Sequence, residues 1–138
     1  MAVTNFDEYR DVFVVADTID DVVHPVTYEL IGQARRIAKE LGQLVQVMLL
    51  GENVQTEAEE LVAHGADIVH VFESPLLKYY TTDGYTKVLT DFFEDHKPNI
   101  LLIGATNNGR DLAPRMSGRM KNGVVADCTI LTVDTEEG

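Results

Sequence analysis

Two patterns of apolar residues alternate along the chain. Short apolar runs rich in β-branched residues predict strands buried on both faces. These runs lie at 11–16, 44–50, 68–72, 100–103 and 124–133. Between them, apolar residues spaced three and four apart predict amphipathic helices. The helical patterns lie at 25–41, 57–64, 85–93 and 112–120. Because strands that alternate with helices favour a parallel sheet, the predicted fold class is α/β, an open, mostly parallel sheet with helices on both faces.

Local signals predict where the helices begin and end. Gly42 is the expected C-cap of the first helix, and Thr56 with Glu59 forms a capping-box pattern at the start of the second. In the last helix we expect Asp111 as N-cap. Pro114 then falls in the first turn, where its missing N–H has no partner to lose.

The size and composition of the chain predict one domain, residues 1–138. Its 138 residues, 45% of them hydrophobic, can bury one sizeable core and are too few for two ordinary domains. No apolar run approaches the roughly 18 residues that span a bilayer. The first fifteen residues lack the basic segment of a secretory signal. We therefore expect no membrane span and a cytoplasmic location.

The charge is strongly acidic and unevenly distributed. A formal net charge of −12 argues against a general nucleic-acid or anionic-membrane surface, since both need a basic footprint. One segment departs from this balance by placing four bases against the single acid Asp111, a local charge of +3. The four bases are Arg110, Arg115, Arg119 and Lys121. If the domain has an anionic partner, this segment is where it is expected to bind.

The loop after the strand at 100–103 is the main candidate site. It reads GATNNGRD, residues 104–111, and leads into the basic helix. Ligands of open parallel sheets gather at the carboxyl ends of strands, where glycines admit a ligand and helix N-termini offer free amides. The spacing matches neither the P-loop nor the dinucleotide fingerprint. An anion or nucleotide contact and an ordinary strand-to-helix turn therefore both remain open.

The sequence predicts no metal site and no catalytic group. The acidic loop at 16–24 lacks the ligand spacing of a calcium loop and is interpreted as a solvated loop. The histidines are scattered, which argues against structural zinc. They are His24, His64, His70 and His96. His64 and His70 are expected to be surface or cap residues.

Other reactive side chains also lack a catalytic setting. Ser74 and Ser117 lie in no nucleophile motif, and Cys128 is expected to be a buried structural thiol. Three tyrosines could stack on a flat ligand, although at their spacing they are expected to cover the sheet edge or a partner surface. They are Tyr79, Tyr80 and Tyr85.

Four segments resemble the amino-terminal domain of the alpha subunit of electron-transferring flavoproteins. They read VFVVAD, ELIGQARRIAKELG, ELVAHGAD and KPNILLIGATNNGRDLAPRMSGRMKNGVVADCT. The most distinctive part is GATNNGRDLAPR, followed by a short helix and ADCT. Its form is more similar to the alpha subunits of anaerobic, electron-bifurcating systems than to those of the mitochondrial type.

The resemblance implies a fold and a role. The fold is adenine-nucleotide-hydrolase-like, a Rossmann-like arrangement, and the domain pairs with a beta subunit in a heterodimer. The role is to support electron transfer between flavins and a dehydrogenase of acyl-CoA or related type. In the family, FAD in the alpha subunit is held by a carboxy-terminal domain, which is not part of these 138 residues. The resemblance therefore implies that this chain alone binds no FAD and is not itself an enzyme.

The family motif carries over onto the loop at 104–115 only as a candidate interface. The resemblance implies a role at the subunit interface and near the nucleotide of the beta subunit, with no catalytic residue. The candidates are Gly104, Asn107, Gly109, Arg110 and Arg115. A structural alternative makes Asp111 a helix cap and Arg115 an ion-pair partner within the domain.

Two other functions remain as rivals. The first is an autonomous nucleotide-binding module of the universal-stress-protein type. Its glycine-rich loop usually ends in a G-S or G-T pair, which the segment at 104–125 lacks. The second is a hydrolase of the same superfamily, for which only Asp17 and Asp111 offer candidate acids at strand ends.

Overall fold

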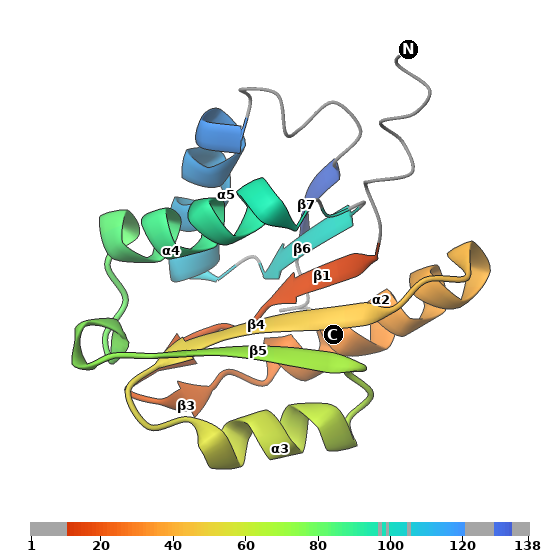
Figure 1. Cartoon of the computed structure of the whole chain (residues 1–138), viewed down its shortest axis with the longest axis horizontal. Helices are drawn as coiled ribbons and strands as arrows, with labels where there is room; N and C mark the ends of the chain where they lie inside the picture. The colour runs from red at the N-terminus through yellow and green to blue at the C-terminus, as the bar shows by residue number, and fades with distance from the viewer. Residues whose placement is uncertain (1–10, 97, 99, 105, 121–128, 134–138) are drawn as a thin grey trace.

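The chain folds around one parallel sheet flanked by helices (Figure 1). The computed structural model describes residues 11–96, 98, 100–104, 106–120 and 129–133. The strands of the main sheet are β1 (Val12–Val15), β4 (Val45–Gly51), β5 (Ile68–Glu73), β6 (Ile100–Gly104) and β7 (Thr129–Val133). The helices are α2 (Val26–Leu41), α3 (Gln55–Ala63), the short 3₁₀ helix η1 (Pro75–Leu77), α4 (Thr82–Asp95) and α5 (Asn107–Met120). These elements confirm the predicted α/β class.

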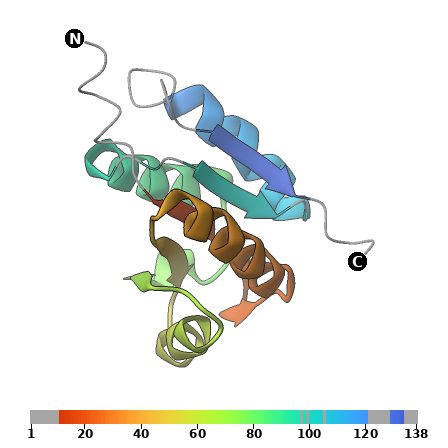
Figure 2. The same ribbon diagram turned by 90° about the vertical axis from the view of Figure 1, so that its right-hand side faces the viewer.

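The sheet has the order β5-β4-β1-β6-β7, and every pairing in it is parallel. The register places Val14 of β1 between Val47 of β4 and Leu102 of β6. The last two strands, β6 and β7, lie side by side near α5 in Figure 2. The chain order therefore reverses direction between β1 and β6, which is where open α/β sheets bind ligands.

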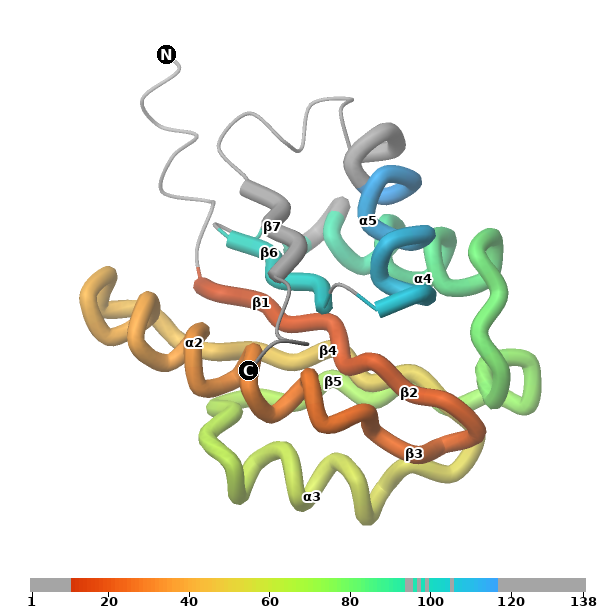
Figure 3. The backbone as a smooth tube through the Cα atoms, turned by 180° about the vertical axis from the view of Figure 1, so that it is seen from behind, coloured from red at the N-terminus to blue at the C-terminus, as the bar shows by residue number. Residues whose placement is uncertain are grey.

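Alternate residues of the buried strands form two separate cores. Val12, Val14 and Val47 face α2 and α3, whereas Phe13 and Met48 face α4 and α5. Figure 3 shows α2 and α3 on one side of the strands and α4 and α5 on the other. The period of two along each strand thus decides which pair of helices each residue contacts.

Several predicted element ends are confirmed. Helix α2 ends at Leu41, and Gly42 follows with a left-handed φ of 66°, as expected for a glycine after a helix. Helix α4 ends before Pro98. The strand predicted at 124–133 is β7 in its second half, while 124–128, including Cys128, and the predicted stop at 122–123 lie outside the described residues.

Five expectations are wrong. Helix α3 begins at Gln55, after Val54, so Thr56 and Glu59 form no capping box. The acidic loop at 16–24 contains a small antiparallel hairpin, β2 (Thr18–Ile19) with β3 (Val22–Val23). Helix α5 begins five residues early, at Asn107, so Asp111 is not its N-cap. Pro114 consequently lies inside the helix rather than in its first turn.

The fifth concerns His70, which is not a surface or cap residue. It lies within the edge strand β5, half-buried, and hydrogen-bonds to Gln46 of the neighbouring strand. His64, by contrast, is the C-cap of α3 and is exposed, as expected. The sequence prediction failed for His70 because strand position alone did not show which side chain of β4 lies beside it.

Candidate functional site

The carboxyl ends of β1 and β6 form the crevice where the chain order reverses. Asp17 follows β1, and Thr106 opens the first turn of α5 after β6. The Thr106 hydroxyl donates a hydrogen bond to the Asp17 carboxylate across this crevice. The backbone N–H of Asp17 is in turn held by the Thr27 hydroxyl of α2 at 3.0 Å. The two loops at the switch point are therefore tied to each other.

Thr106 also caps α5, which explains where this helix begins. Its hydroxyl accepts from the N–H of Gly109 at 3.1 Å, and its carbonyl accepts from the N–H of Arg110 at 2.8 Å. This is the geometry of a threonine N-cap. Both Thr106 and Asp111 are residue types that cap helices. Of the two, only Thr106 forms a hydrogen bond to Asp17.

Asp111 instead joins α5 to the start of α4. Its carboxylate accepts from the Tyr80 hydroxyl at 2.7 Å and from the Thr82 hydroxyl. Burial, followed by the hydrogen bond to Asp111, raises the pKa of Tyr80 to about 12. The hydrogen bonds from Thr82 and Tyr80 lower the pKa of the Asp111 carboxyl. Asp111 therefore accepts hydrogen bonds that join α5 to the start of α4, and their donors, Thr82 and Tyr80, are the cause of its lowered pKa.

Tyrosine side chains fill the other side of the crevice. Tyr85 is buried, and its hydroxyl donates to the carbonyl of Leu77 at 2.8 Å and lies 3.4 Å from the Thr18 hydroxyl. The ring of Tyr80 packs edge-on against that of Tyr85, with centroids 5.0 Å apart. Tyr79 is 61% exposed. Tyr85 thus belongs to the core between the sheet and α4, and Tyr80 packs against that core rather than along an edge strand.

Little open space remains between these groups. The crevice lined by Ala16, Thr18, Tyr80, Gly104 and Asn108 has a cavity volume of about 20 Å³. That is room for roughly one or two water molecules, whereas ligand pockets measure about 300–1,000 Å³. As the described residues define it, the switch-point crevice is filled by the domain's own side chains.

Both glycines of the candidate loop are explained by packing within the domain. A Cβ atom on Gly104 would lie 3.1 Å from a methyl group of Val26 in α2. A Cβ atom on Gly109 would lie 1.8 Å from the carbonyl oxygen of Gly104. Close approach of α5 to the end of β6 therefore requires the second glycine. Packing within the domain thus accounts for these two glycines, as in an ordinary strand-to-helix turn.

The polar candidates on α5 lie on its exposed surface. Asn107, Arg110 and Arg115 are all exposed. Arg115 forms an ion pair with Asp83 of α4, Nη2 to Oδ1 at 2.7 Å, as the structural alternative predicted. Exposed pairs of this kind contribute little stability. The side chains of Arg119 and Lys121, which complete the predicted basic segment, lie outside the described residues.

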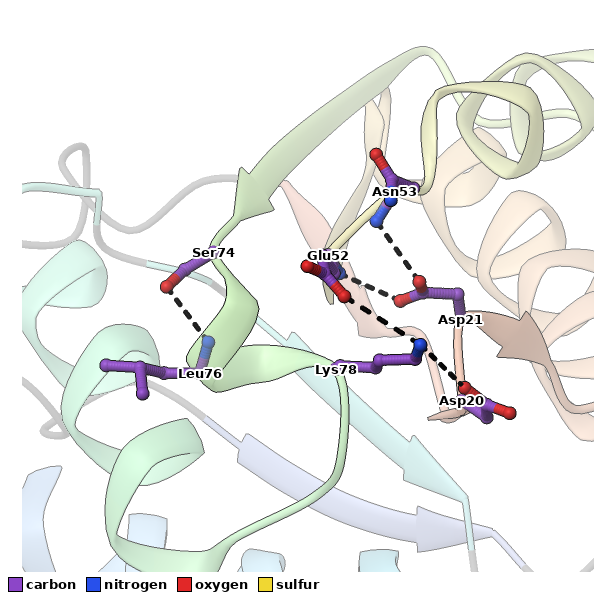
Figure 4. A network of polar contacts seen from close by, with 7 residues as sticks. All are labelled: Asp20, Asp21, Glu52, Asn53, Ser74, Leu76 and Lys78. Carbon is purple, nitrogen blue, oxygen red and sulfur yellow. Dashed lines mark hydrogen bonds and ion pairs between the residues drawn. The ribbon is translucent and has the colours of Figure 1, made fainter.

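The acidic loop at 16–24 is anchored rather than simply solvated. The carboxylate of Asp21 accepts from the backbone N–H groups of Glu52 and Asn53 at 2.8 and 3.2 Å. Figure 4 shows Lys78 between Asp20 and Glu52, with Nζ to carboxylate distances of 3.6 and 3.9 Å. Within the described part of the chain, no group of three or more metal-ligating side chains comes together here or elsewhere.

The helices of the described residues include none that is both long and apolar enough to cross a membrane.

Comparison with known proteins gives one family. The family described as electron transfer flavoprotein domain matches residues 12–137. The chain is 45% identical over 130 residues to the electron transfer flavoprotein subunit alpha of Megasphaera elsdenii, covering 94% of this chain and 38% of that protein. It is 47% identical over 123 residues to "Lactate dehydrogenase (NAD(+),ferredoxin) subunit LctC" of Acetobacterium woodii, covering 89% of this chain and 29% of that protein.

A third relative carries a different name. The chain is 43% identical over 130 residues to the acryloyl-CoA reductase electron transfer subunit beta of Anaerotignum propionicum, covering 94% of this chain and 35% of that protein. The chain thus spans between 29% and 38% of the length of these three relatives.

Solved structures with the same fold include universal stress proteins. One, from Archaeoglobus fulgidus in complex with dAMP, superposes with a TM-score of 0.54 at 16% identity and covers 90% of this chain and 97% of its own. Another, in complex with cAMP, has the same TM-score and identity and covers 91% of this chain and 98% of its own. At this identity the likeness shows the adenine-nucleotide-hydrolase-like fold alone.

Proposed function

The chain belongs to the electron transfer flavoprotein domain family, and from this premise we propose that it is the amino-terminal domain of an alpha subunit. In this role it is a scaffold and subunit interface that supports electron transfer between flavins and a dehydrogenase. The observation that carries the proposal is the 45% identity to a flavoprotein alpha subunit over 94% of the chain. The name of the Acetobacterium woodii relative, with NAD(+) and ferredoxin, supports an electron-bifurcating type.

The geometry of the crevice supports a scaffold role for this domain. The Thr106–Asp17 hydrogen bond and the Tyr80–Tyr85 ring pair occupy the strand-end crevice where open α/β sheets bind ligands. The hydrolase hypothesis depended on two candidate acids, Asp17 and Asp111, and both are hydrogen-bonded to side chains of the domain. We therefore propose no catalytic residue and no enzyme activity in this chain.

We expect the purified chain to be colourless and to bind no ATP at micromolar concentrations. An isoalloxazine ring needs a pocket with stacking and hydrogen-bonding walls, and the crevice has a volume of about 20 Å³. Absorbance between 350 and 500 nm, about the flavin range, measures the first point, and equilibrium dialysis with labelled ATP the second. A stoichiometric flavin band would contradict the assignment of FAD to another part of the complex. Micromolar ATP binding would instead support an autonomous nucleotide-binding module of the universal-stress-protein type.

The second subunit of the complex is the proposed partner, and the basic segment its proposed contact. We expect the chain to form a complex with a cognate beta subunit, detectable by light scattering. The double substitution Arg110→Glu and Arg119→Glu should slow association and reduce its salt dependence. The physical reason is that exposed charge steers encounter and sets orientation more than it sets affinity.

A matched control separates local from overall charge. Arg36→Glu with Lys39→Glu makes the same change in net charge on the exposed face of α2, across the sheet from α5. Association rates of both double variants are measured at low and high salt, with circular dichroism to verify folding. If the wild-type chain forms no complex, the proposed partnership fails. If the two double variants associate at the same rate as each other, the basic segment has no special effect. It is then a solvated helix face, and the contact lies elsewhere.

A further inference from the structure

Two histidines far apart in the sequence come together on the outer edge of the sheet. His70 lies in the edge strand β5, and His96 is the C-cap of α4. Their ring centres are 5.9 Å apart. Phe92 lies against both: its ring stacks parallel to His96 at 4.0 Å and contacts His70 at 4.7 Å. The pair lies outside the crevice described above and has no part in the proposed function.

Hydrogen bonds fix which nitrogen of His70 carries a proton. The ionised carboxylate of Asp11 can only accept, so the Gln46 amide must donate to it, at 2.6 Å. The amide oxygen of Gln46 therefore faces His70 Nε2, also at 2.6 Å, and that nitrogen must donate. In the neutral ring, Nδ1 of His70 is then left with a lone pair and no hydrogen bond to a described residue.

The same reasoning applies to His96. Its Nδ1 lies 3.2 Å from the carbonyl oxygen of Phe92, which can only accept. Nδ1 therefore carries the proton, and Nε2 of the neutral ring carries the lone pair. Burial, followed by the proximity of His96, lowers the pKa of His70.

We propose that His70 and His96 bind Zn²⁺ as a two-imidazole site open to solvent. A Zn–N bond of about 2.0–2.1 Å, with about 1.1 Å more to each ring centre, places two imidazoles at the tetrahedral angle about 5.2 Å apart. The observed separation of 5.9 Å is longer than this by about 0.7 Å, a shift that the exposed His96 side chain can make on binding the ion. Water fills the remaining coordination positions, because His96 is exposed.

The partners of the other ring nitrogens support this assignment. Metal-binding histidines usually donate their second N–H to a carboxylate, a carbonyl or a similar acceptor, which fixes the tautomer and orients the ring. His70 donates to Gln46, which is itself held by Asp11, and His96 donates to a backbone carbonyl. Both imidazoles thus have their anchoring bond in place.

Titration of the chain with Zn²⁺ by isothermal calorimetry tests the site. We expect one bound ion per chain and at least a tenfold weaker affinity in His96→Gln, which removes a ligand from an exposed position and leaves the core intact. His64→Gln is the matched control. His64 is also an exposed helix C-cap, and its Nδ1 lies 2.8 Å from the backbone carbonyl oxygen of Glu60. Its ring, however, contacts Tyr28 instead of another histidine.

Several outcomes would overturn the proposal. Absence of Zn²⁺ binding to the wild-type chain does so, as does an equal loss of affinity in His64→Gln, which would show dispersed surface binding. A second measurement does not depend on variants: in ¹⁵N spectra of the imidazoles, Zn²⁺ should shift Nδ1 of His70 and Nε2 of His96. Shifts confined to the opposite nitrogens would contradict the assigned ligand atoms.

Discussion

Replacing Gly109 by alanine is expected to lower the free energy of unfolding by about 3 kcal/mol. The added Cβ would lie 1.8 Å from the carbonyl oxygen of Gly104 and 3.2 Å from Cγ2 of Ile103. The first neighbour is backbone, so the first turn of α5 must move away from β6 to relieve the overlap. That movement also disturbs the bond from the Thr106 hydroxyl to the Gly109 N–H. Urea unfolding followed by circular dichroism measures the change.

Gly32→Ala provides the control for this substitution. Gly32 lies inside α2, and a Cβ placed there meets no atom within 4 Å. Alanine has the higher helix propensity, so this variant should be more stable by about 0.5–1 kcal/mol. If Gly109→Ala were as stable as the wild type, the close packing of α5 on the end of β6 would be wrong.

Phe93→Ala is expected to cost about 3–5 kcal/mol of unfolding free energy. Phe93 is 0% exposed and joins α4 to the sheet, with its ring edge-on to Phe13 of β1 at 5.3 Å. It is also edge-on to Phe92, at 5.3 Å. Truncation removes these contacts and leaves a cavity that a parallel sheet packed on both faces cannot easily close.

The control for Phe93→Ala is a similar truncation on the other side of the sheet. Val62 lies on α3 and is 52% exposed, so Val62→Ala should change stability by no more than about 0.5 kcal/mol. Thermal unfolding of both variants in parallel measures the difference. A loss of less than about 1 kcal/mol in Phe93→Ala would show that the core between α4 and β1 is not packed as described.

Helix ends show where local sequence is sufficient and where it is not. Gly42 ends α2 through its own left-handed backbone, a property of the residue itself. The sequence predicted Asp111 as the N-cap of α5, whereas the structure has Thr106 in that place, a residue type that also caps helices. Asp17, 89 residues away, bonds to Thr106, and Tyr80 and Thr82 bond to Asp111. Long-range partners therefore placed the helix start.

The sequence by itself determined the α/β class, the strands of the sheet and the family, because apolar periodicity and the GATNNGRDLAPR motif are read along the chain. Only the tertiary structure decided that the switch-point crevice is filled and that His70 lies 5.9 Å from His96. The physical reason is that each depends on side chains brought together from separate elements by the parallel crossovers. Spacing along one segment carries no information about such contacts.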